Sequence, residues 1–329
     1  MTALVTGAAG FIGSALCERL LAQGEEIYGV DCFTPFYAPA YKHANLRSLL
    51  AHPRFTLHEV DLRATDVGSL LVDVDVVYHL AAQPGVRASW EDFPTYVEHN
   101  IVATQRLLDA LQAHGGEKRM IFASSSSVYG DGVSMSSTES DVPRPHSPYG
   151  VTKLAAEQLC AAYGANFGVH TVLLRYFTVY GPRQRPDMGI HRLIEAALRS
   201  VPFPRFGDGS HVRSFTFVED VVDGTIAAAS ADVAPGSVIN IAGGESTTIS
   251  QLITLVEELT GRVIDVDRRP AQPGDVHRTD GQIERAARWL GWRPRIGLRA
   301  GVAQQVSWHR RLLAEANSGE EHVLDQKIG

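Results

Sequence analysis

A glycine-rich turn near the start of the chain limits the possible folds more than any other feature. Residues 6–13 read TGAAGFIG; they follow the apolar run 3–5 and open the helical pattern of 14–23. In such a strand–turn–helix unit, the first glycine permits a tight turn, the second lets the backbone approach a pyrophosphate, and the third lets helix and strand pack closely. Amide groups at the helix start then face the phosphates. The turn predicts a dinucleotide site that includes Gly7, Gly10, Phe11, Ile12 and Gly13.

Strands and helices alternate through the first half of the chain. Apolar, β-branched segments predict strands, and longer segments with helical periodicity lie between them. Such alternation builds a parallel, doubly wound sheet, so we expect an α/β fold of the Rossmann type with a smaller C-terminal substrate-binding lobe. The expected strands are 3–5, 26–30, 55–60, 74–79, 119–123, 170–175 and 263–266, and the expected helices are 14–23, 96–114, 149–167, 190–199 and 248–259.

The chain divides into two expected parts. Residues 1–177 form the dinucleotide-binding domain, and elements around 213–241 return to it. Residues 178–316 form mainly a substrate-binding lobe, because Pro- and Gly-rich loops interrupt the regular alternation there. The polar tail 317–329 is expected to be flexible.

Composition excludes several classes of partner. The net charge of −7 and the pI near 6.0 do not suit binding to nucleic acid or to an anionic membrane. No apolar run approaches the roughly 20 residues of a membrane helix. Three cysteines, Cys17, Cys32 and Cys160, lack metal-ligand spacing and are typical of reduced thiols in a cytoplasmic protein. The thirteen histidines show no ligand spacing either, so no metal site is expected.

Acidic residues after the second and third strands indicate which dinucleotide binds. Asp31 closes the second strand about 20 residues after the turn, where a carboxylate accepts from both ribose hydroxyls of NAD. The same charge repels the 2′-phosphate of NADP, so NAD is the expected cofactor. The alternative is a solvated turn aspartate. Asp61 and Leu62 follow the third strand and are expected at the adenine edge.

Tyr149 and Lys153 are candidate catalytic residues. They lie four positions apart on a predicted helix and share one face. Such a pair is often structural, but the serine run 124–127 stands at the carboxyl end of a strand, where ligands bind in parallel sheets. A phenol near an ammonium group and a nicotinamide cation is expected to have a lowered pKa and to act as a general base.

Taken together, these motifs resemble the extended short-chain dehydrogenase/reductases, and within them the nucleotide-sugar 4-epimerases. The resemblance covers nearly the whole chain, and the order and spacing of the motifs are more specific than any one of them. The shared motifs are 6–13, HLAAQ at 79–83, the serine run, Tyr149 with Lys153, RYF at 175–177 and GDG at 207–209 followed by Arg213. A closer resemblance to UDP-glucuronate 4-epimerases lies in 82–87, 177–182, 185–188 and 272–276.

The resemblance implies roles for individual residues. Tyr149 would remove the 4-hydroxyl proton, and Lys153 would hold the nicotinamide ribose and lower the tyrosine pKa. Ser125, four residues before Tyr129, matches the catalytic Ser or Thr, and its neighbour Ser126 would share the task. Oxidation at C4 and reduction from the opposite face would return NAD to its starting state. The other expected NAD contacts are Leu80, Ala81, Ala82 and Tyr176.

Substrate recognition is implied in the same way. Arg213 matches the diphosphate-binding arginine, and Thr178 and Arg185 match the residues expected to hold a C6 carboxylate so that CO₂ is not lost. Arg183 replaces a bulky aromatic residue, which leaves room for relaxed selectivity; a solvated basic loop is the alternative. The expected substrate contacts are Ser125, Ser126, Thr178, Arg185, Arg213, Asp275 and Arg278.

We therefore predict NAD-dependent 4-epimerisation of a UDP-sugar, foremost UDP-glucuronate. The alternatives are a UDP-glucose/galactose 4-epimerase, alone or as a dual activity, then a UDP-glucuronate decarboxylase, and last a non-catalytic NAD-sensing regulator. The dehydratases of this group carry Asp-Glu where this chain has Ser126 and Ser127, and the decarboxylases carry a Glu at the second of these positions. Ser214, however, replaces the Asp that is usual in epimerases and resembles the decarboxylases. Helices 96–114 and 149–167 would form a homodimer through a four-helix bundle.

Overall fold

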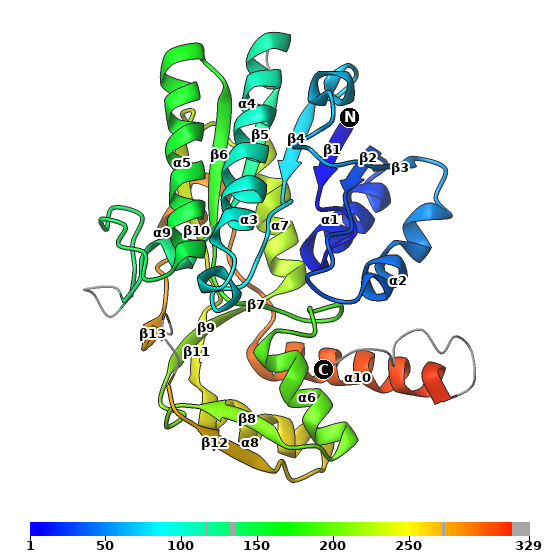
Figure 1. The fold of residues 1–329 in the computed structure, drawn as a ribbon, viewed down its shortest axis with the longest axis vertical. Coiled ribbons are helices and arrows are strands. Elements are labelled where there is room, and N and C mark those ends of the chain that lie inside the picture. The colour runs from blue at the N-terminus through cyan, green and yellow to red at the C-terminus, as the bar shows by residue number, and fades with distance from the viewer. Residues whose placement is uncertain (116–117, 132–135, 272–273, 275, 318–329) are drawn as a thin grey trace.

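Seven parallel strands form the large sheet in the upper part of Figure 1. The computed structural model describes residues 1–115, 118–131, 136–271, 274 and 276–317. The strand order is β10-β6-β5-β4-β1-β2-β3, so the chain runs outwards from β1 in both directions and confirms the predicted doubly wound α/β fold. The strands are β1 (Thr2–Thr6), β2 (Glu26–Asp31), β3 (Phe55–Glu59), β4 (Val76–His79), β5 (Arg119–Ser125), β6 (His170–Tyr176) and β10 (Ser237–Ile241).

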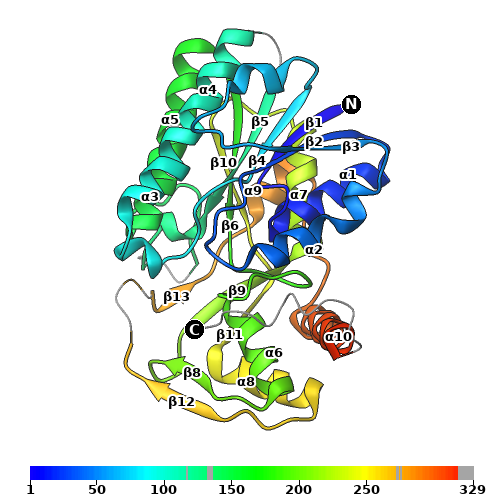
Figure 2. The same cartoon turned by 45° about the vertical axis from the view of Figure 1, so that its right-hand side comes forward.

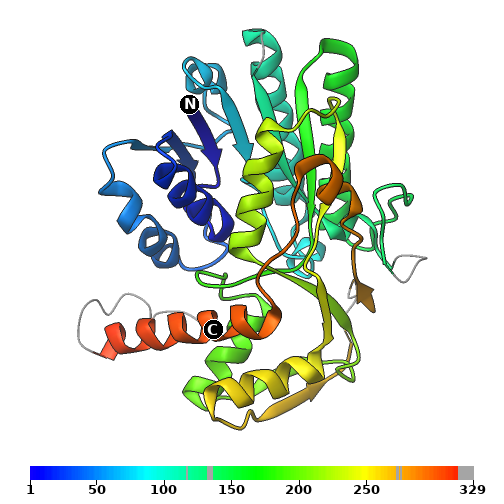
Figure 3. The ribbon, with the colours of Figure 1, turned by 180° about the vertical axis from the view of Figure 1, so that it is seen from behind.

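Side chains alternate between two buried faces of this sheet. In β1, Ala3 and Val5 belong to one hydrophobic cluster, whereas Leu4 between them belongs to a second. The first cluster contains residues of α1 (Phe11–Ala22), α2 (Pro39–Leu50) and α7 (Val218–Ser230), and Figure 3 shows α1 beside α7. The second contains residues of α4 (Ala103–His114) and α5 (Pro148–Phe167). Because helices cover both faces, the central strands β1 and β4 are buried along nearly their whole length.

The helix predicted at 96–114 starts earlier and contains an irregular turn. Helix α3 (Phe93–Val97) continues through the π-helical segment Glu98–Val102 into α4. Such turns redirect side chains and often occur at functional sites. This one buries Asn100, which accepts from the Gln83 amide at 2.7 Å and donates to Thr152 Oγ1 at 3.0 Å. The turn therefore joins the loop after β4 to α5.

A smaller lobe lies below the large sheet (Figure 2) and combines short sheets with three helices. One hydrophobic cluster contains Val5 of the large sheet as well as Leu193, Val256 and Val302 of this lobe, so the core is continuous. Strand β9 (Val212–Phe217) pairs with β7 (Val179–Tyr180), β11 (Glu245–Thr248) and β13 (Arg278–Thr279), and β8 (Phe203–Phe206) pairs with β12 (Val266–Arg269). The helices are α6 (Gly189–Arg199), α8 (Ile249–Thr260) and α10 (Leu298–Asn317).

Several elements differ from the sequence-based expectation. The strand predicted at 263–266 was misplaced, since β12 starts at Val266. Within 213–241, α7 and β10 join the large sheet, whereas β9 belongs to the smaller lobe. Helices α2 and α10 were not predicted, and residues 318–329 of the tail lie outside the described chain. The remaining short elements are η1 (Val67–Leu71), η2 (Ala88–Trp90), η4 (Ser126–Val128) and α9 (Glu284–Leu290).

None of the helices in the described ranges combines the length and apolar character needed to cross a membrane.

Candidate active site

A cavity opens at the carboxyl edge of the large sheet. It lies beside β1, from which the successive strands run outwards in opposite directions. Every residue that the sequence assigned to the cofactor lines this cavity, although those residues end or follow six different strands, β1 to β6. Arg185, assigned to the substrate, lies in the same wall. The lining includes Gly7, Gly10, Phe11, Ile12, Gly13, Asp31, Asp61, Leu62, Leu80, Ala81, Ala82, Tyr149, Lys153 and Tyr176.

The glycine turn is too crowded for side chains. Gly7 has a φ of 74°, and a Cβ atom there would lie 2.9 Å from the backbone nitrogen of Ala81. A Cβ atom on Gly13 would lie 2.1 Å from the carbonyl oxygen of Gly7. The amides of Gly7, Ala8 and Gly10 donate to backbone carbonyl groups, and that of Ala9 donates to Asp31, so the start of α1 is the part of this unit that offers amides to the cavity. A cradle of this shape fits the pyrophosphate of a dinucleotide.

Asp31 is not a solvated turn residue but part of a buried ion pair. Its Oδ1 lies 2.8 Å from Nζ of Lys42, and the two side chains are 6% and 9% exposed. The carboxylate also accepts from the amides of Phe33 and Ala9, at 2.9 and 3.2 Å. Sequence reasoning missed Lys42, which lines the cavity from α2. The apolar spacing of Leu46 and Leu49, both buried, was the available signal for that helix.

Asp61 pairs with its near neighbour Arg63. The guanidinium donates to both carboxylate oxygens, with the shortest contact of 2.6 Å between Arg63 Nη2 and Asp61 Oδ2. This hydrogen bonding lowers the pKa of Asp61, which carries its charge at neutral pH. His99 from the π-helical segment lines the same part of the cavity.

Tyr149 and Ser125 meet across the gap between α5 and β5. The serine hydroxyl is hydrogen-bonded to the phenol, and this bond and the charge of Arg185 both lower the tyrosine pKa. Burial outweighs them, so the pKa of Tyr149 is raised rather than lowered. The predicted fall includes the charge of a bound nicotinamide cation and therefore stays a prediction. Ser125 also accepts from the amide of Ser127 at 3.1 Å, which fixes its side chain at the start of η4.

Lys153 is buried one helical turn after Tyr149. Its Nζ lies 4.3 Å from the ring centre of Phe122, and burial lowers its pKa to about 8, against the opposing charge of Glu157. Glu157 lies a further turn along α5 and forms a buried pair with Arg175 of β6, with contacts of 2.9 and 2.7 Å. Ser124 donates to the same carboxylate. The helix face that carries Tyr149 thus rests on a buried charged network.

Arg185 approaches this catalytic face from the smaller lobe. Its guanidinium donates to both oxygens of Asp187 at 2.9 and 3.0 Å and is 21% exposed. Burial opposes its charge, but Asp187 more than compensates, and the pKa of Arg185 is raised. Arg183, two residues earlier, does not face the cavity: it contacts Glu18 on α1 at 2.7 Å. Neither arginine is a solvated loop residue.

Other predicted substrate residues lie apart from the cavity lining. Arg213 on β9 donates to the carbonyl groups of Val212, Val276 and His277, and Arg278 on the neighbouring β13 pairs with Asp280. Thr178 lies between β6 and β7, where its carbonyl accepts from the Thr216 amide. Ser126 opens η4, and Asp275 lies outside the described residues.

The family assignment rests on more than this geometry. A sequence model of the NAD dependent epimerase/dehydratase family matches residues 3–242, which include the cavity residues and all seven strands of the large sheet except one residue of β1. The chain belongs to this family. The predicted resemblance is confirmed, and so is NAD as the cofactor with which family members work.

Members of the family with solved structures are similar along nearly the whole chain. UDP-glucuronic acid 4-epimerase from Bacillus cereus, in complex with UDP-glucuronic acid and NAD, is 44% identical with a TM-score of 0.91, covering 95% of this chain and 100% of that one. MoeE5, solved with NAD and UDP-glucuronic acid, is 41% identical with a TM-score of 0.87, covering 95% of this chain and 100% of that one. MoeE5 has also been solved with UDP-glucose and NAD.

A further relative is similar over a comparable length of chain. The uncharacterized UDP-glucose epimerase YtcB of Bacillus subtilis (strain 168) is 43% identical over 313 residues, which cover 94% of this chain and 98% of the relative. The Bacillus cereus and Bacillus subtilis relatives are thus named as epimerases of UDP-sugars, and glucuronate and glucose both occur among the ligands and names of the three relatives.

Proposed function

We propose that this protein is an NAD-dependent UDP-glucuronate 4-epimerase, which interconverts UDP-glucuronate and UDP-galacturonate through a transient 4-keto sugar. The observation that carries the substrate choice is Arg185, a cation in the wall of the cavity close enough to influence Tyr149. A guanidinium beside the reacting end of the sugar suits a carboxylate at C6. The similar Bacillus cereus enzyme, solved with UDP-glucuronic acid, supports the same choice.

The residues present fit NAD. The start of α1 provides backbone amides for the pyrophosphate, Asp31 offers carboxylate oxygens to the adenosine ribose, and Asp61 and Leu62 line the adenine end. Lys153 and Tyr176 line the opposite end, near Tyr149, and would hold the nicotinamide half. When bound, NAD supplies the reversible two-electron oxidation at C4 of the sugar.

The chain's own groups move the proton. Tyr149 accepts the proton of the 4-hydroxyl as the C4–H bond breaks, and it returns the proton when the alcohol forms again. Ser125, hydrogen-bonded to the phenol, orients the sugar oxygen and stabilises the charge that develops on it. Because burial raises the pKa of Tyr149 in the free protein, the ammonium group of Lys153 and the positive charge of the bound cofactor must favour the phenolate.

Arg185 would hold the C6 carboxylate during this step. The 4-keto form of a uronic acid is a β-keto acid. Such an acid loses CO₂ when the bond to its carboxylate is aligned with the π orbitals of the carbonyl group. Fixing the carboxylate through Arg185 and Thr178 prevents that alignment. Ser127 supplies no acid at the position where the decarboxylases of this group carry a Glu, so epimerisation is favoured over decarboxylation.

Further arginines of the smaller lobe would bind the diphosphate. Arg213 and Arg278 lie on adjacent, paired strands, β9 and β13. Arg192 on α6 is influenced by the charges of Arg87 and Arg269; burial and these two neighbours lower its pKa. Such mutual repulsion among cations is relieved by a polyanionic ligand. We propose Arg213 and Arg278 as the sequence suggested, and add Arg192.

A UDP-glucose 4-epimerase is the second candidate. It is favoured by the pairing of Arg185 with Asp187, which neutralises the guanidinium without any substrate carboxylate. MoeE5, solved with either sugar nucleotide, shows that one relative's site accommodates both ligands.

One experiment separates these functions. The purified protein is incubated separately with UDP-glucuronate and with UDP-glucose, and products are followed by ¹H NMR. We expect UDP-galacturonate from the first, formed faster than UDP-galactose from the second. A UDP-pentose with release of CO₂ would refute the proposal, faster conversion of UDP-glucose would favour the second candidate, and no turnover of either would favour a non-catalytic regulator.

We also propose the assembly and location that the sequence suggested. Helices α4 and α5 lie side by side (Figure 1), and α5 exposes Val151 and Phe167, apolar side chains that a four-helix bundle in a homodimer would cover. Three free cysteines are compatible with the reducing cytoplasm. Within each subunit, 1–177 would serve the cofactor and 178–316 mainly the substrate.

A further inference from the structure

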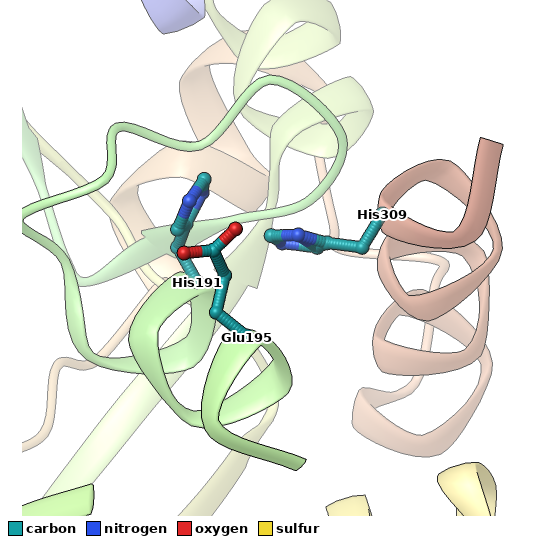
Figure 4. Close-up of side chains that lie close together, drawn as sticks. All are labelled: His191, Glu195 and His309. Carbon is teal, nitrogen blue, oxygen red and sulfur yellow. The ribbon is translucent and has the colours of Figure 1, made fainter. Parts of the chain in front are cut away.

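Two buried histidines and a glutamate meet between α6 and α10, outside the cofactor cavity (Figure 4). His191 and Glu195 stand one turn apart on α6, and His309 reaches towards them from α10. One ligand atom from each residue can be chosen so that all lie within 4.8 Å of one another. No metal site was predicted, because the histidines show no ligand spacing along the chain. Only the packing of α10 on α6 brings His309 close to His191 and Glu195.

Two nitrogen atoms of this cluster have no hydrogen-bond partner. They are Nε2 of His191 and Nε2 of His309. The two residues are only 1% and 2% exposed, respectively. Buried polar atoms are nearly always bonded, and exceptions ask for an explanation such as a bound ion. Here the centres of the two imidazole rings lie 4.4 Å apart, and the carboxylate of Glu195 lies beside them.

The hydrogen bonding of His191 sets which of its nitrogens is free. Its Nδ1 lies 2.8 Å from the carbonyl oxygen of Gln184, which can only accept, so Nδ1 carries the proton. A neutral imidazole ring that is protonated on Nδ1 carries its lone pair on Nε2. Nε2 of His191 then presents a lone pair to the cluster. A neutral ring held by a backbone carbonyl is the usual state of a metal-binding histidine.

The charges around the cluster are mixed. Glu195 contributes a carboxylate whose side chain is 20% exposed, so solvent reaches the cluster from that side. Arg199 lies 3.4 Å from Glu195 Oε1 and is the nearby cation with which a metal ion would compete. Its side chain is 41% exposed.

We propose that His191, Glu195 and His309 bind a divalent transition-metal ion, with zinc as the ion that best suits the donors. Two imidazoles and one carboxylate with water in the fourth position match the ligands and the tetrahedral preference of zinc. The ion would link α6 to α10. Its effect extends to the substrate loop, since Gln184 Oε1 accepts from the His191 amide and from Gln305 on α10, at 2.9 and 2.8 Å.

The test uses the untagged, NAD-containing protein after treatment with a chelator. Zinc binding is measured by titration calorimetry, thermal stability is compared with and without ZnCl₂, and CoCl₂ serves as a spectroscopic probe. We expect one zinc ion per chain, a higher Tm with zinc, and the visible absorption of tetrahedral cobalt. Absence of stoichiometric zinc binding to the wild-type protein would overturn the proposal, whatever the variants do.

Variants then locate the ion. Glu195→Gln and His309→Gln are each expected to weaken zinc binding at least about tenfold, as even the loss of a supporting residue does at metal sites. His114→Gln is the matched control, because His114 is an exposed histidine at the end of α4 and should not affect binding. Equal affinity in all three variants would place the zinc elsewhere and refute the site. If His309→Gln unfolds, Glu195→Gln still locates the ion. The cobalt spectrum of the wild-type protein reports tetrahedral binding without any variant.

Discussion

Arg183 and Arg185 lie two residues apart on the loop between β7 and α6, yet carboxylates hold their guanidinium groups in different places. Arg183 contacts Glu18 on α1 at 2.7 Å, whereas Arg185 is paired with Asp187 in the wall of the cavity. Arg183 has a φ of 67°, a left-handed conformation that turns the chain between the two side chains. One loop thus presents one arginine to the scaffold and one to the substrate.

This relationship provides a matched test of carboxylate recognition. Arg185→Ala should reduce kcat/KM for UDP-glucuronate about 10- to 150-fold, the equivalent of one charge-assisted hydrogen bond of about 1.5–3 kcal/mol. The loss for UDP-glucose should be much smaller. Arg183→Ala removes an equal charge from the same loop and should affect both substrates equally. Equal losses for both substrates in Arg185→Ala would show that Arg185 does not recognise the carboxylate. Steady-state kinetics with both sugar nucleotides measure these ratios.

Tyr149→Phe should abolish epimerisation while NAD remains bound. The substitution removes the phenol that exchanges the proton but keeps the ring, which contacts Tyr96 edge to face with ring centres 6.3 Å apart. Ser125→Ala should leave a residual rate, about 10²–10⁴-fold below wild type, because it removes one supporting hydrogen bond. Rates are compared with NAD content, measured by chromatography of nucleotides released on denaturation. Near-normal turnover in Tyr149→Phe would assign the base elsewhere.

The sequence predicted features that depend on residues close together in the chain. The glycine turn and the pair Tyr149 and Lys153 each lie within one turn or one helix, so spacing alone places them. Lys42 and His309 could not be found in this way, because their partners Asp31 and His191 lie on other elements. Those contacts arise only when α2 packs against α1 and β3, and α10 against α6.

The sign of the Tyr149 pKa shift was beyond the sequence for a different reason. Motif reasoning counted the nearby charges that stabilise the phenolate. It did not count desolvation, whose size depends on how deeply the ring is buried once both lobes are in place. In the folded chain desolvation outweighs the effects of Ser125 and Arg185.

Glu157 should control the pH at which Lys153 loses its charge. Lys153 has a pKa of about 8, lowered by burial and supported by Glu157, so its ammonium form decreases as the pH rises through that value. Glu157→Gln should lower this pKa further and move the alkaline fall of kcat/KM to lower pH. The variant also leaves Arg175 buried without its carboxylate, at a cost of about 3–5 kcal/mol of stability.

The double variant Glu157→Gln with Arg175→Gln separates the two effects. Replacing both partners removes the unpaired charge and should recover much of the stability. The alkaline limb should stay at lower pH, since the carboxylate is still missing. A limb that returned to the wild-type position in the double variant would show that Glu157 acts through folding and not through its charge on Lys153.

Asp31 should determine the choice between NAD and NADP through its pairing with Lys42. The carboxylate faces the place of the ribose and repels a 2′-phosphate, while it neutralises the only cation within 4.0 Å of it among the described residues. Asp31→Asn keeps the size of the side chain, removes the repulsion and leaves a buried ammonium group free to pair with the phosphate. We expect the ratio of bound NADP to bound NAD to rise by about tenfold or more, equivalent to 1.4 kcal/mol. The ratio is measured after incubation of nucleotide-depleted protein with equal amounts of both nucleotides.

Asp61→Asn is the control for this prediction. It alters a second aspartate of the cavity, which is already paired with Arg63, and should leave the ratio unchanged. Adding Lys42→Ala to Asp31→Asn should remove most of the gain. If NADP binding stayed poor in Asp31→Asn, or persisted without Lys42, the discrimination would lie in the shape of the turn and not in this ion pair.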